Sequence, residues 1–261
     1  MALRGKSALV TGSTSGIGLG IARALAAEGA DVMLNGFGEA AAIAGLREEI
    51  GRRSGVRVGY AGANVSKPAE IREMIAHTVT ELGGCDILVN NAGVQHTAPI
   101  EQFPDDEWDR ILAINLSGAF HAIKAVAPWM KRRGWGRIIN VASVHGLVAS
   151  GEKAAYVAAK HGLVGLTKVA AIELAADGIT CNAICPGWVL TTLVQRQIDA
   201  RAEREHRDVS DVSQDLLAEK QPLRRFTNPE QIGALVVFLC SDAAATMTGA
   251  PFSVDGGWAA Q

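Results

Sequence analysis

The stretch "SALVTGSTSGIGLGIARALAAEG", residues 7–29, decides the fold class of this chain. It begins with a short apolar run typical of a β-strand, passes through a glycine-rich turn and continues as an apolar helical pattern. Glycines at positions 12, 16 and 18 let the backbone turn tightly and approach a pyrophosphate, which the N–H groups at a helix start can bind. A glycine-rich turn alone could be a plain tight turn, but its place between strand and helix favours a dinucleotide site.

The rest of the chain repeats this alternation of strand and helix. Further strand-like runs lie at 30–35, 56–65, 85–93, 136–143, 179–187 and 250–257, separated mostly by helical patterns. Strands joined by helical crossovers form parallel sheets with both faces covered, and the runs "ILVN" and "IINV" are apolar enough for that burial. We therefore predict an α/β fold, a single Rossmann-type doubly wound domain over residues 1–261. Its seven-stranded parallel sheet carries helices on both faces.

One segment, Leu190 to Gln221, interrupts the pattern. It is highly charged, and its apolar residues are too sparse for a core helix. One interpretation is a solvated helical insertion. The other is a mobile helical lid, because the segment leaves the sheet after the carboxyl end of the sixth strand, where open α/β sheets bind ligands.

Composition excludes several classes of partner. The 261 residues are 48% hydrophobic and 20% charged, with a formal net charge of −2 and no basic block, so we expect no nucleic-acid partner. No uncharged apolar run reaches about 18 residues, so we expect no transmembrane helix and no membrane partner. The first residues run straight into a strand, without the pattern of a signal peptide. The four cysteines lack metal-site spacing and are expected to be small buried residues, without a metal site, in a cytoplasmic protein.

The stretch "ASVHGLVASGEKAAYVAAK", residues 142–160, carries the candidate chemistry. Ser143 ends a strand beside the expected cofactor crevice, while Tyr156 and Lys160 are four residues apart and share one helix face. A lysine ammonium about 4 Å from a phenol would lower the phenol pKa by roughly three units, toward neutrality. Taken singly, Tyr156 and Lys160 are more typical of packing, but together with Ser143 they predict an acid/base centre.

Several motifs, in order along essentially the whole chain, resemble the short-chain dehydrogenase/reductase family. They are "TGSTSGIG", "NNAG" at 90–93, Asn115, Ser143 with Tyr156 and Lys160, and "PG" at 186–187. The resemblance implies a Rossmann-type fold, a nicotinamide cofactor and usually a homotetramer. It also implies that Tyr156 is the acid/base on the substrate hydroxyl and that Ser143 hydrogen-bonds the same oxygen. Lys160 would hold the nicotinamide ribose, and Asn115 a water that relays the proton. The implied cofactor-binding residues are Gly12, Thr14, Ser15, Gly16, Ile17, Gly18, Phe37, Asn64, Val65, Asn91, Gly93, Tyr156, Lys160, Pro186, Gly187, Val189 and Thr191.

The residues after the second strand favour NAD over NADP. An acid there usually binds the ribose hydroxyls of NAD and an arginine the 2′-phosphate of NADP, but Asn35, Gly36 and Phe37 provide neither. Ser15 stands where NADP-dependent members of the family tend to carry Arg or Lys. Without a cation, the dianionic 2′-phosphate would lack a partner. Asn64 replaces the Asp that the family usually places near the adenine, and its amide oxygen can still accept a hydrogen bond.

A second group of polar residues suggests the substrate. His145 and Lys153 lie between Ser143 and Tyr156, Gln95 follows another strand, and Gln197 shares a helix face with Leu193 and Val194 in the 190–221 segment. Alone, His145 and Lys153 would each be interpreted as a surface residue of a loop. Four converging donors, one of them cationic, would suit a small carboxylate. A narrower resemblance, to the family members that oxidise short 3-hydroxy acids, implies the same role for these four residues. Trp188 is expected to wall the pocket, whereas Trp258 is more typical of packing.

Two alternatives remain beside an NAD-dependent dehydrogenase of a 3-hydroxy acid. A 3-oxoacyl thioester reductase of the same fold would prefer NADPH, and Ser15 and the compact cationic pocket argue against it. A non-catalytic dinucleotide sensor would have no need of the reactive Tyr156 and Lys160, which this chain keeps.

Overall fold

The computed structural model describes residues 1–260, and the strands of this range form one parallel sheet. The strands are β1 (Ser7–Val10), β2 (Asp31–Asn35), β3 (Val58–Ala61), β4 (Ile87–Asn90), β5 (Gly136–Val141), β6 (Ile179–Pro186) and β7 (Pro251–Val254). Their order is β3-β2-β1-β4-β5-β6-β7, and every neighbouring pair is parallel. The two halves of the sheet diverge between β1 and β4, the switch point at which such sheets bind ligands. The predicted seven-stranded parallel sheet is confirmed.

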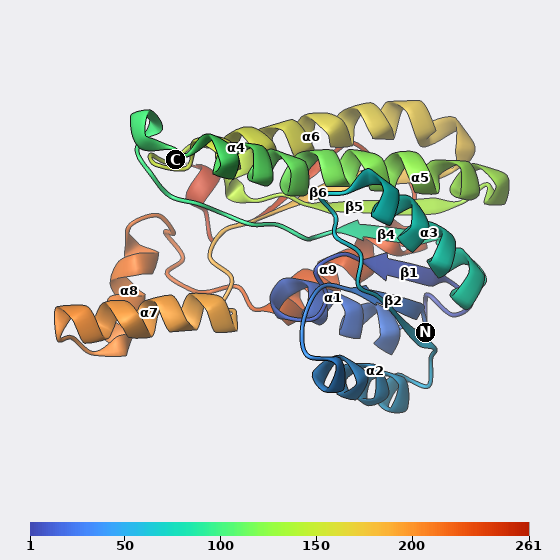
Figure 1. Ribbon diagram of the computed structural model, residues 1–261, viewed down its shortest axis with the longest axis horizontal. Coiled ribbons are helices and arrows are strands. Elements are labelled where there is room, and N and C mark those ends of the chain that lie inside the picture. Colours follow the sequence, from blue (N-terminus) through green and yellow to red (C-terminus); the bar gives the residue numbers. More distant parts are fainter. Residues whose placement is uncertain (261) are drawn as a thin grey trace.

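Helices cover both faces of this sheet (Figure 1). One layer holds α1 (Gly16–Ala27), α2 (Ala40–Ser54) and α9 (Pro229–Cys240); the other holds α3 (Pro68–Leu82), α4 (Asp105–Leu112), α5 (Gly118–Arg133) and α6 (Ala154–Leu174). Short 3₁₀ segments lie at Ile100–Gln102, Val144–Gly146, Ala175–Asp177, Asp242–Ala244 and Trp258–Ala260. The side chains of successive strand residues point to opposite faces of the sheet. In β1, Ala8 and Val10 pack in the core on the α1 side, and Leu9 packs in the core on the α3 side. This is why the strands read as continuous apolar runs.

Helices α4 and α5 form one continuous helical run, joined by a π-helical segment at Ala113–Ser117. Asp105–Arg133 is the one helix in residues 1–260 whose length and apolar composition would allow it to cross a membrane, although no uncharged run of that length exists in the sequence. Here it is the crossover from β4 to β5. Its buried residues Ala122, Val126 and Met130 pack in the core beneath the sheet.

The segment after β6 forms two helices, α7 (Thr192–Glu205) and α8 (Val209–Ala218), which extend away from the sheet beyond the carboxyl ends of its strands (Figure 1). The pair has a small core of its own, in which Ile198, Ala202 and Val212 are buried. An ion pair of 2.6 Å joins Arg207, in the turn between the two helices, to Asp215 on α8. The predicted helical segment over 190–221 is confirmed, and we call it the lid segment below.

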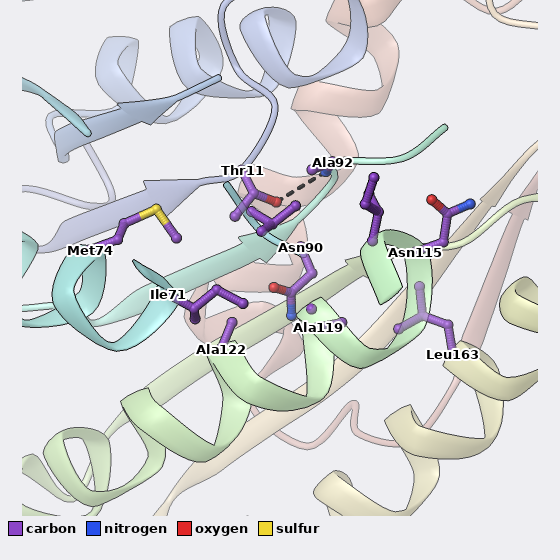
Figure 2. A pocket seen from close by; sticks show the side chains of 12 residues that line it. Thr11, Ile71, Met74, Asn90, Ala92, Asn115, Ala119, Ala122 and Leu163 are labelled. Atoms are coloured by element: carbon purple, nitrogen blue, oxygen red, sulfur yellow. Dashed lines mark hydrogen bonds between the residues drawn. The ribbon is translucent and has the colours of Figure 1, made fainter. Parts of the chain in front are cut away.

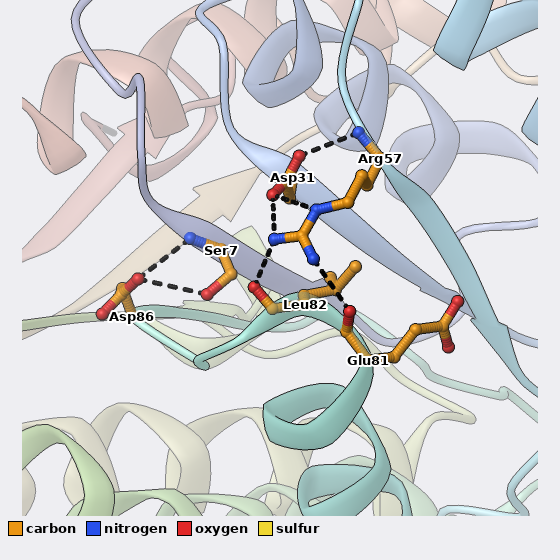
Figure 3. A network of polar contacts seen from close by, with 6 residues as sticks. All are labelled: Ser7, Asp31, Arg57, Glu81, Leu82 and Asp86. Carbon is orange, nitrogen blue, oxygen red and sulfur yellow. Dashed lines mark hydrogen bonds and ion pairs between the residues drawn. The ribbon is translucent and has the colours of Figure 1, made fainter.

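The opposite, amino-terminal edge of the sheet carries a polar network (Figure 3). The Arg57 guanidinium contacts Asp31 Oδ2 at 2.6 Å and donates to the carbonyls of Glu81 and Leu82, the last residues of α3. Because those carbonyls have no partner within the helix, Arg57 closes the end of α3. The network lies at the edge of the sheet remote from the carboxyl ends, so its role is structural.

Candidate active site

The glycine-rich turn after β1 has the geometry of a phosphate cradle. Gly12 and Gly16 have φ values of 63° and 54°, in the left-handed region that favours glycine. A Cβ on Gly18 would lie only 2.3 Å from the carbonyl oxygen of Gly12. Ser15 makes no side-chain cap at the start of α1, and the first turn contains no acid. The N–H groups there are therefore suited to an anionic phosphate.

The "NNAG" motif supports this turn from the neighbouring strand. The Thr11 hydroxyl accepts hydrogen bonds from the backbone N–H groups of Asn91 and Ala92, the latter drawn in Figure 2. The Asn91 side-chain amide donates to the carbonyls of Thr11 and Gly12. Asn91 is predicted to contact the cofactor, but here both of its amide hydrogen bonds go to the glycine-rich turn, which they stabilise.

The loop after β2 faces the same end of the sheet. Gly36 has a φ of 146° and passes so close to Thr14 that an added Cβ would lie 2.6 Å from the Thr14 hydroxyl. That hydroxyl donates to the Phe37 carbonyl at 3.1 Å. The Phe37 side chain is 70% exposed. The glycine-rich turn and the loop after β2, which is expected to select the cofactor, are therefore joined by a direct hydrogen bond.

Asn64 differs from its predicted role. Its Oδ1 accepts hydrogen bonds from both the backbone N–H and the hydroxyl of Ser66, at 3.0 and 2.8 Å. An amide oxygen has two lone pairs, so the oxygen expected to serve an adenine is already occupied. Only the amide nitrogen of Asn64 is left for a ligand.

The remaining cofactor candidates lie on the loops around the crevice. Gly187 donates its N–H to the Val254 carbonyl, just after the buried Pro186, and Val189 is buried. Thr191 caps α7, and its methyl carbon lies 3.6 Å from the point where a Cβ on Gly16 would stand. The lid segment therefore begins against the glycine-rich turn. Ile17 packs on the α1-side core and Val65 lies against the start of α5.

The four predicted catalytic residues lie around the carboxyl ends of β4 and β5. A Cβ on Gly93 would lie 3.4 Å from Asn115 Oδ1 and 3.7 Å from Lys160 Nζ, so these two side chains flank Gly93. Lys160 Nζ donates to the Val141 carbonyl at 2.8 Å and lies 5.5 Å from the centre of the Tyr156 ring. Ser143 follows β5 and hydrogen-bonds the Tyr156 phenol.

Asn115 is held in the π-helical segment by both backbone groups of Val94. Its Oδ1 accepts from the Val94 N–H and its Nδ2 donates to the Val94 carbonyl, both at 2.9 Å. Figure 2 shows it at the end of a small pocket whose lining also includes Thr11, Asn90 and Leu163. An amide has two donors and two acceptor sites, so one of each remains for a water.

The electrostatics of the acid/base pair differ from the sequence-based expectation. Burial raises the pKa of the Tyr156 phenol, and the hydrogen bond with Ser143 opposes this only in part. Burial also lowers the pKa of Lys160 to about 8. The expected lowering of the phenol pKa by Lys160, with the positive charge of an oxidised nicotinamide helping, is therefore not found in the free protein, because the same burial disfavours the charged form of both groups.

A wall of aromatic and basic residues lies beside Tyr156. The buried His145 ring stands edge-on to Tyr156 and to Trp258, with centroids 6.1 and 5.3 Å apart. Trp188 lies 6.2 Å from Trp258, and Lys153 Nζ stands 6.0 Å from the centre of the Trp188 ring. The structure thus brings His145, Lys153 and Trp188 together as predicted. Trp258, expected to serve packing, belongs to the same wall.

Two polar atoms of this wall are buried without a hydrogen-bond partner among the described residues, Trp188 Nε1 and His145 Nδ1. Leaving such atoms unpaired costs free energy, which favours a polar ligand at this wall. Burial and, to a smaller extent, Lys153 lower the pKa of His145 to about 4, while the Val148 backbone opposes the shift. Burial also lowers the pKa of Lys153. His145 is therefore neutral near pH 7.

Gln95 and Gln197 are not brought into this wall. Both side chains are exposed, and neither makes a hydrogen bond to another residue in the range 1–260. On α7 the buried residue is Ile198, and Leu193, predicted to share the inward face with Gln197, is 65% exposed. Gln95 lies on the loop after β4 and Gln197 on α7, so a common role with Lys153 would require both side chains to turn inward.

Sequence reasoning missed Gln221, a fully buried residue at the base of the lid segment. Its side-chain oxygen accepts the backbone N–H of Trp188 at 2.7 Å. Nothing in the charged segment around it marks this glutamine as different from an exposed one. The four cysteines, in contrast, are free and buried as expected.

Comparisons with known proteins place these features in context. Residues 12–259 match the family model described as enoyl-(acyl carrier protein) reductase. The chain is 58% identical, over 99% of its length and all of the relative's, to D-beta-hydroxybutyrate dehydrogenase of Cupriavidus necator. It is 51% identical, over 98% of its length and 99% of the relative's, to the protein of the same name from Rhizobium meliloti. Among solved structures, L-sorbose reductase of Gluconobacter frateurii, complexed with NADPH and L-sorbose, matches the whole of both chains with a TM-score of 0.95 and 31% identity.

Proposed function

The chain belongs to the short-chain dehydrogenase/reductase family, and we propose that it interconverts D-3-hydroxybutyrate and acetoacetate with NAD as cofactor. The observation that carries this proposal is the wall beside Tyr156. There, Lys153 and His145 stand against Trp188, and the indole N–H of Trp188 has no partner among residues 1–260. A half-buried cation beside an apolar surface suits a small molecule with a carboxylate at one end and a methyl group at the other. The names of the two relatives support the same substrate.

In this mechanism the chain orients the substrate and moves one proton. Lys153 and His145 bind the carboxylate, with Gln95 and Gln197 joining when the lid segment closes, and Trp188 contacts the methyl end. The C3 hydroxyl then lies between Ser143 and Tyr156. Tyr156 takes the hydroxyl proton, and Ser143 hydrogen-bonds the same oxygen. Bound NAD in its oxidised form would place a positive charge beside the phenol and would take up the hydride from C3.

Lys160 and Asn115 assist that proton transfer. Lys160 binds the nicotinamide ribose while its ammonium stabilises the Tyr156 phenolate. Asn115 holds a water through the amide capacity that Val94 leaves free, and this water passes the proton outward. The glycine-rich turn binds the pyrophosphate, which its free N–H groups and the absence of an acid in the first turn of α1 support.

NAD rather than NADP is supported by the loop after β2. The 2′-phosphate of NADP would meet the exposed, uncharged Phe37 and Ser15 rather than an arginine or lysine. The same feature argues against the 3-oxoacyl thioester reductase alternative, which would use NADPH. The sensor alternative is disfavoured by Tyr156 and Lys160 standing together beside Ser143.

The test is a panel of short 3-hydroxy acids of both hands, assayed with NAD and NADP by NADH or NADPH absorbance, beside a 3-oxoacyl thioester assayed with NADPH. We expect the highest kcat/KM for D-3-hydroxybutyrate with NAD. Faster turnover of the thioester would support the reductase instead. NAD binding without turnover of any member would support the sensor.

We also propose that the protein is a cytoplasmic homotetramer. The family resemblance supports the tetramer, and so do the exposed apolar side chains Phe120, Val169 and Ile172 on the adjacent helices α5 and α6. The free, buried cysteines support a reducing compartment. Light scattering after size exclusion should give a tetramer mass, and Ile172→Glu should lower it. A monomeric parent protein would refute the assembly.

A further inference from the structure

Gln221 stands where three segments of the chain meet beneath the proposed substrate wall. It follows α8 at the base of the lid segment, and only 1% of it is exposed. An added Cβ on Gly187, just after β6, would lie 2.5 Å from its Oε1. An added Cβ on Gly256, just after β7, would lie 2.9 Å from its Nε2. The glutamine therefore contacts the start of the lid segment and the segment that leads to Trp258.

Both polar atoms of the Gln221 amide are hydrogen-bonded in this position. Its Oε1 accepts the Trp188 N–H at 2.7 Å, and its Nε2 donates to the Arg225 carbonyl at 2.8 Å. The other backbone group of Trp188, its carbonyl, accepts from the Thr227 N–H at 3.0 Å. Both polar groups of the Trp188 backbone are thus fixed by the chain that leaves the lid segment, which sets where its indole lies.

Gln221 is also connected to Trp258 through few contacts. Gly256 packs on Gln221 and its carbonyl accepts the Leu223 N–H at 3.0 Å. One residue earlier, the buried Asp255 carboxylate accepts the N–H groups of Gly257 and Ala259, on either side of Trp258. A shift of the Gln221 side chain would therefore move the backbone on both sides of the aromatic wall.

We propose that Gln221 is a positioning residue that locks Trp188 and Trp258 to the base of the lid segment and so sets the shape of the substrate pocket. The proposal rests on the proposed function in taking these two tryptophans as the substrate wall. Gln221 itself does not touch the reacting atoms. Its effect should appear in substrate binding rather than in binding of the adenosine half of the cofactor.

Gln221→Glu is the sharpest test, because it changes one NH₂ group into an oxygen. The ionised glutamate could still accept from Trp188, but its second oxygen would face the Arg225 carbonyl without a proton between them. Protonated, it would donate there as the glutamine does. Burial raises the pKa of a carboxyl group, so the variant should work best at low pH. The nearby charged groups do not mask this: Asp255 is occupied by backbone N–H groups, and the Lys220, Arg224 and Arg225 side chains are exposed.

The experiment compares the kcat/KM of each variant with that of the parent for 3-hydroxybutyrate from pH 5.5 to 9. For Gln221→Glu we expect at least a tenfold loss at pH 8.5, mostly in KM, that shrinks toward threefold or less at pH 5.5. The dissociation constant of ADP-ribose should stay within twofold. Gln214→Glu, the same change at an exposed position on α8, should stay within twofold of the parent at every pH. A loss for Gln221→Glu that does not vary with pH, or that lies in kcat alone, would overturn the proposal.

A second measurement separates this proposal from the proposed function. Gln221→Ala should speed hydrogen exchange of the Trp188 amide and of residues 256–259 by at least tenfold, while amides of β1 and β4 keep their rates. Unchanged exchange at Trp188 would overturn the positioning role whatever the substrate. If the parent protein fails to oxidise 3-hydroxybutyrate but the exchange result holds, the substrate assignment fails and the role of Gln221 in fixing Trp188 stands.

Discussion

At the Tyr156 hydroxyl, burial and charge act in opposite directions. Burial raises the pKa of the phenol, and it lowers the pKa of Lys160, the nearby cation, to about 8. The Ser143 hydrogen bond lowers the phenol pKa by less than burial raises it. The positive charge of an oxidised nicotinamide would supply the missing part. We infer that Tyr156 becomes a base only when the cofactor is bound.

Replacing Tyr156 with phenylalanine removes only the hydroxyl and therefore tests its role in proton transfer. Tyr156→Phe keeps the ring that stands edge-on to His145, so the fold and NADH binding should remain nearly unchanged. Turnover should fall by about 10²–10⁴, the contribution of one positioned acid/base. NADH absorbance gives the rate, and NADH fluorescence titration gives the binding control. Activity within tenfold of the parent would assign the proton transfer to another group.

Lys153 is expected to bind the negatively charged carboxylate of the substrate. Lys153→Met keeps an apolar stem beside Trp188 but removes a charge-assisted contact worth roughly 1.5–3 kcal/mol. For 3-hydroxybutyrate, kcat/KM should therefore fall by about 10- to 150-fold. The methyl ester has no charge to pair and should lose much less. An equal loss for acid and ester would make Lys153 a structural residue and would leave the hydroxy-acid assignment to the relatives alone.

At the scale of elements, the loop after β2 is predicted to choose the cofactor. The parent should prefer NAD over NADP by well over tenfold in kcat/KM. Phe37→Arg places a guanidinium at an exposed position and should narrow this preference by giving the 2′-phosphate a partner. Phe37→Ala is the control, since it opens the same space without a charge. Equal use of both cofactors by the parent protein would contradict the NAD assignment.

The start of α9 offers a test of stability away from the chemistry. Asn228 and Gln231 form a reciprocal capping box, and α9 packs closely on α1, where a Cβ on Gly233 would lie 2.9 Å from the Gly20 carbonyl oxygen. Asn228→Ala should lower the free energy of unfolding by about 1 kcal/mol, within a range of roughly 0.5–2. Urea denaturation measures the loss. Asn228→Asp keeps the acceptor and should recover most of it.

At the scale of the whole molecule, His145 links stability to pH. Its folded pKa, about 4, lies below its ordinary value of 6.5, so below pH 6.5 the unfolded chain binds a proton that the folded protein does not. The stability tied to neutral His145 is thus fully present above pH 6.5 and is lost as the pH falls toward 4. The total is on the order of 3 kcal/mol.

Urea denaturation of the parent and of His145→Gln between pH 7.5 and 4 measures this term, because the carboxylates common to both proteins cancel in the difference. The parent should lose about 3 kcal/mol more than the variant over this range. His206→Gln, a change at an exposed histidine just after α7, should follow the parent in its pH dependence. Parallel curves for the parent and His145→Gln would contradict the burial of a neutral His145.

The sequence by itself determined the sheet, the crossover helices, the glycine-rich turn and the meeting of Ser143, Tyr156 and Lys160. These features depend on short-range patterns. An apolar run buried on both faces marks a strand, a spacing of four residues puts Tyr156 and Lys160 on one helix face, and positive φ at Gly12 and Gly16 requires glycine. The carboxyl ends of parallel strands share one edge, so Ser143 could be placed at the crevice without knowing a single contact.

Only the tertiary structure decided how side chains from distant segments share their hydrogen bonds and their burial. In the folded protein the Asn64 side-chain oxygen accepts from Ser66, and the Asn91 side-chain amide donates to the glycine-rich turn. Trp258, from the end of the chain, packs against His145. The tertiary structure also placed Gln221 beneath Trp188 and reversed the expected shift of the Tyr156 pKa. Hydrogen-bond capacity and desolvation depend on every atom within a few ångströms, and for these residues most of those atoms come from parts of the chain remote in sequence.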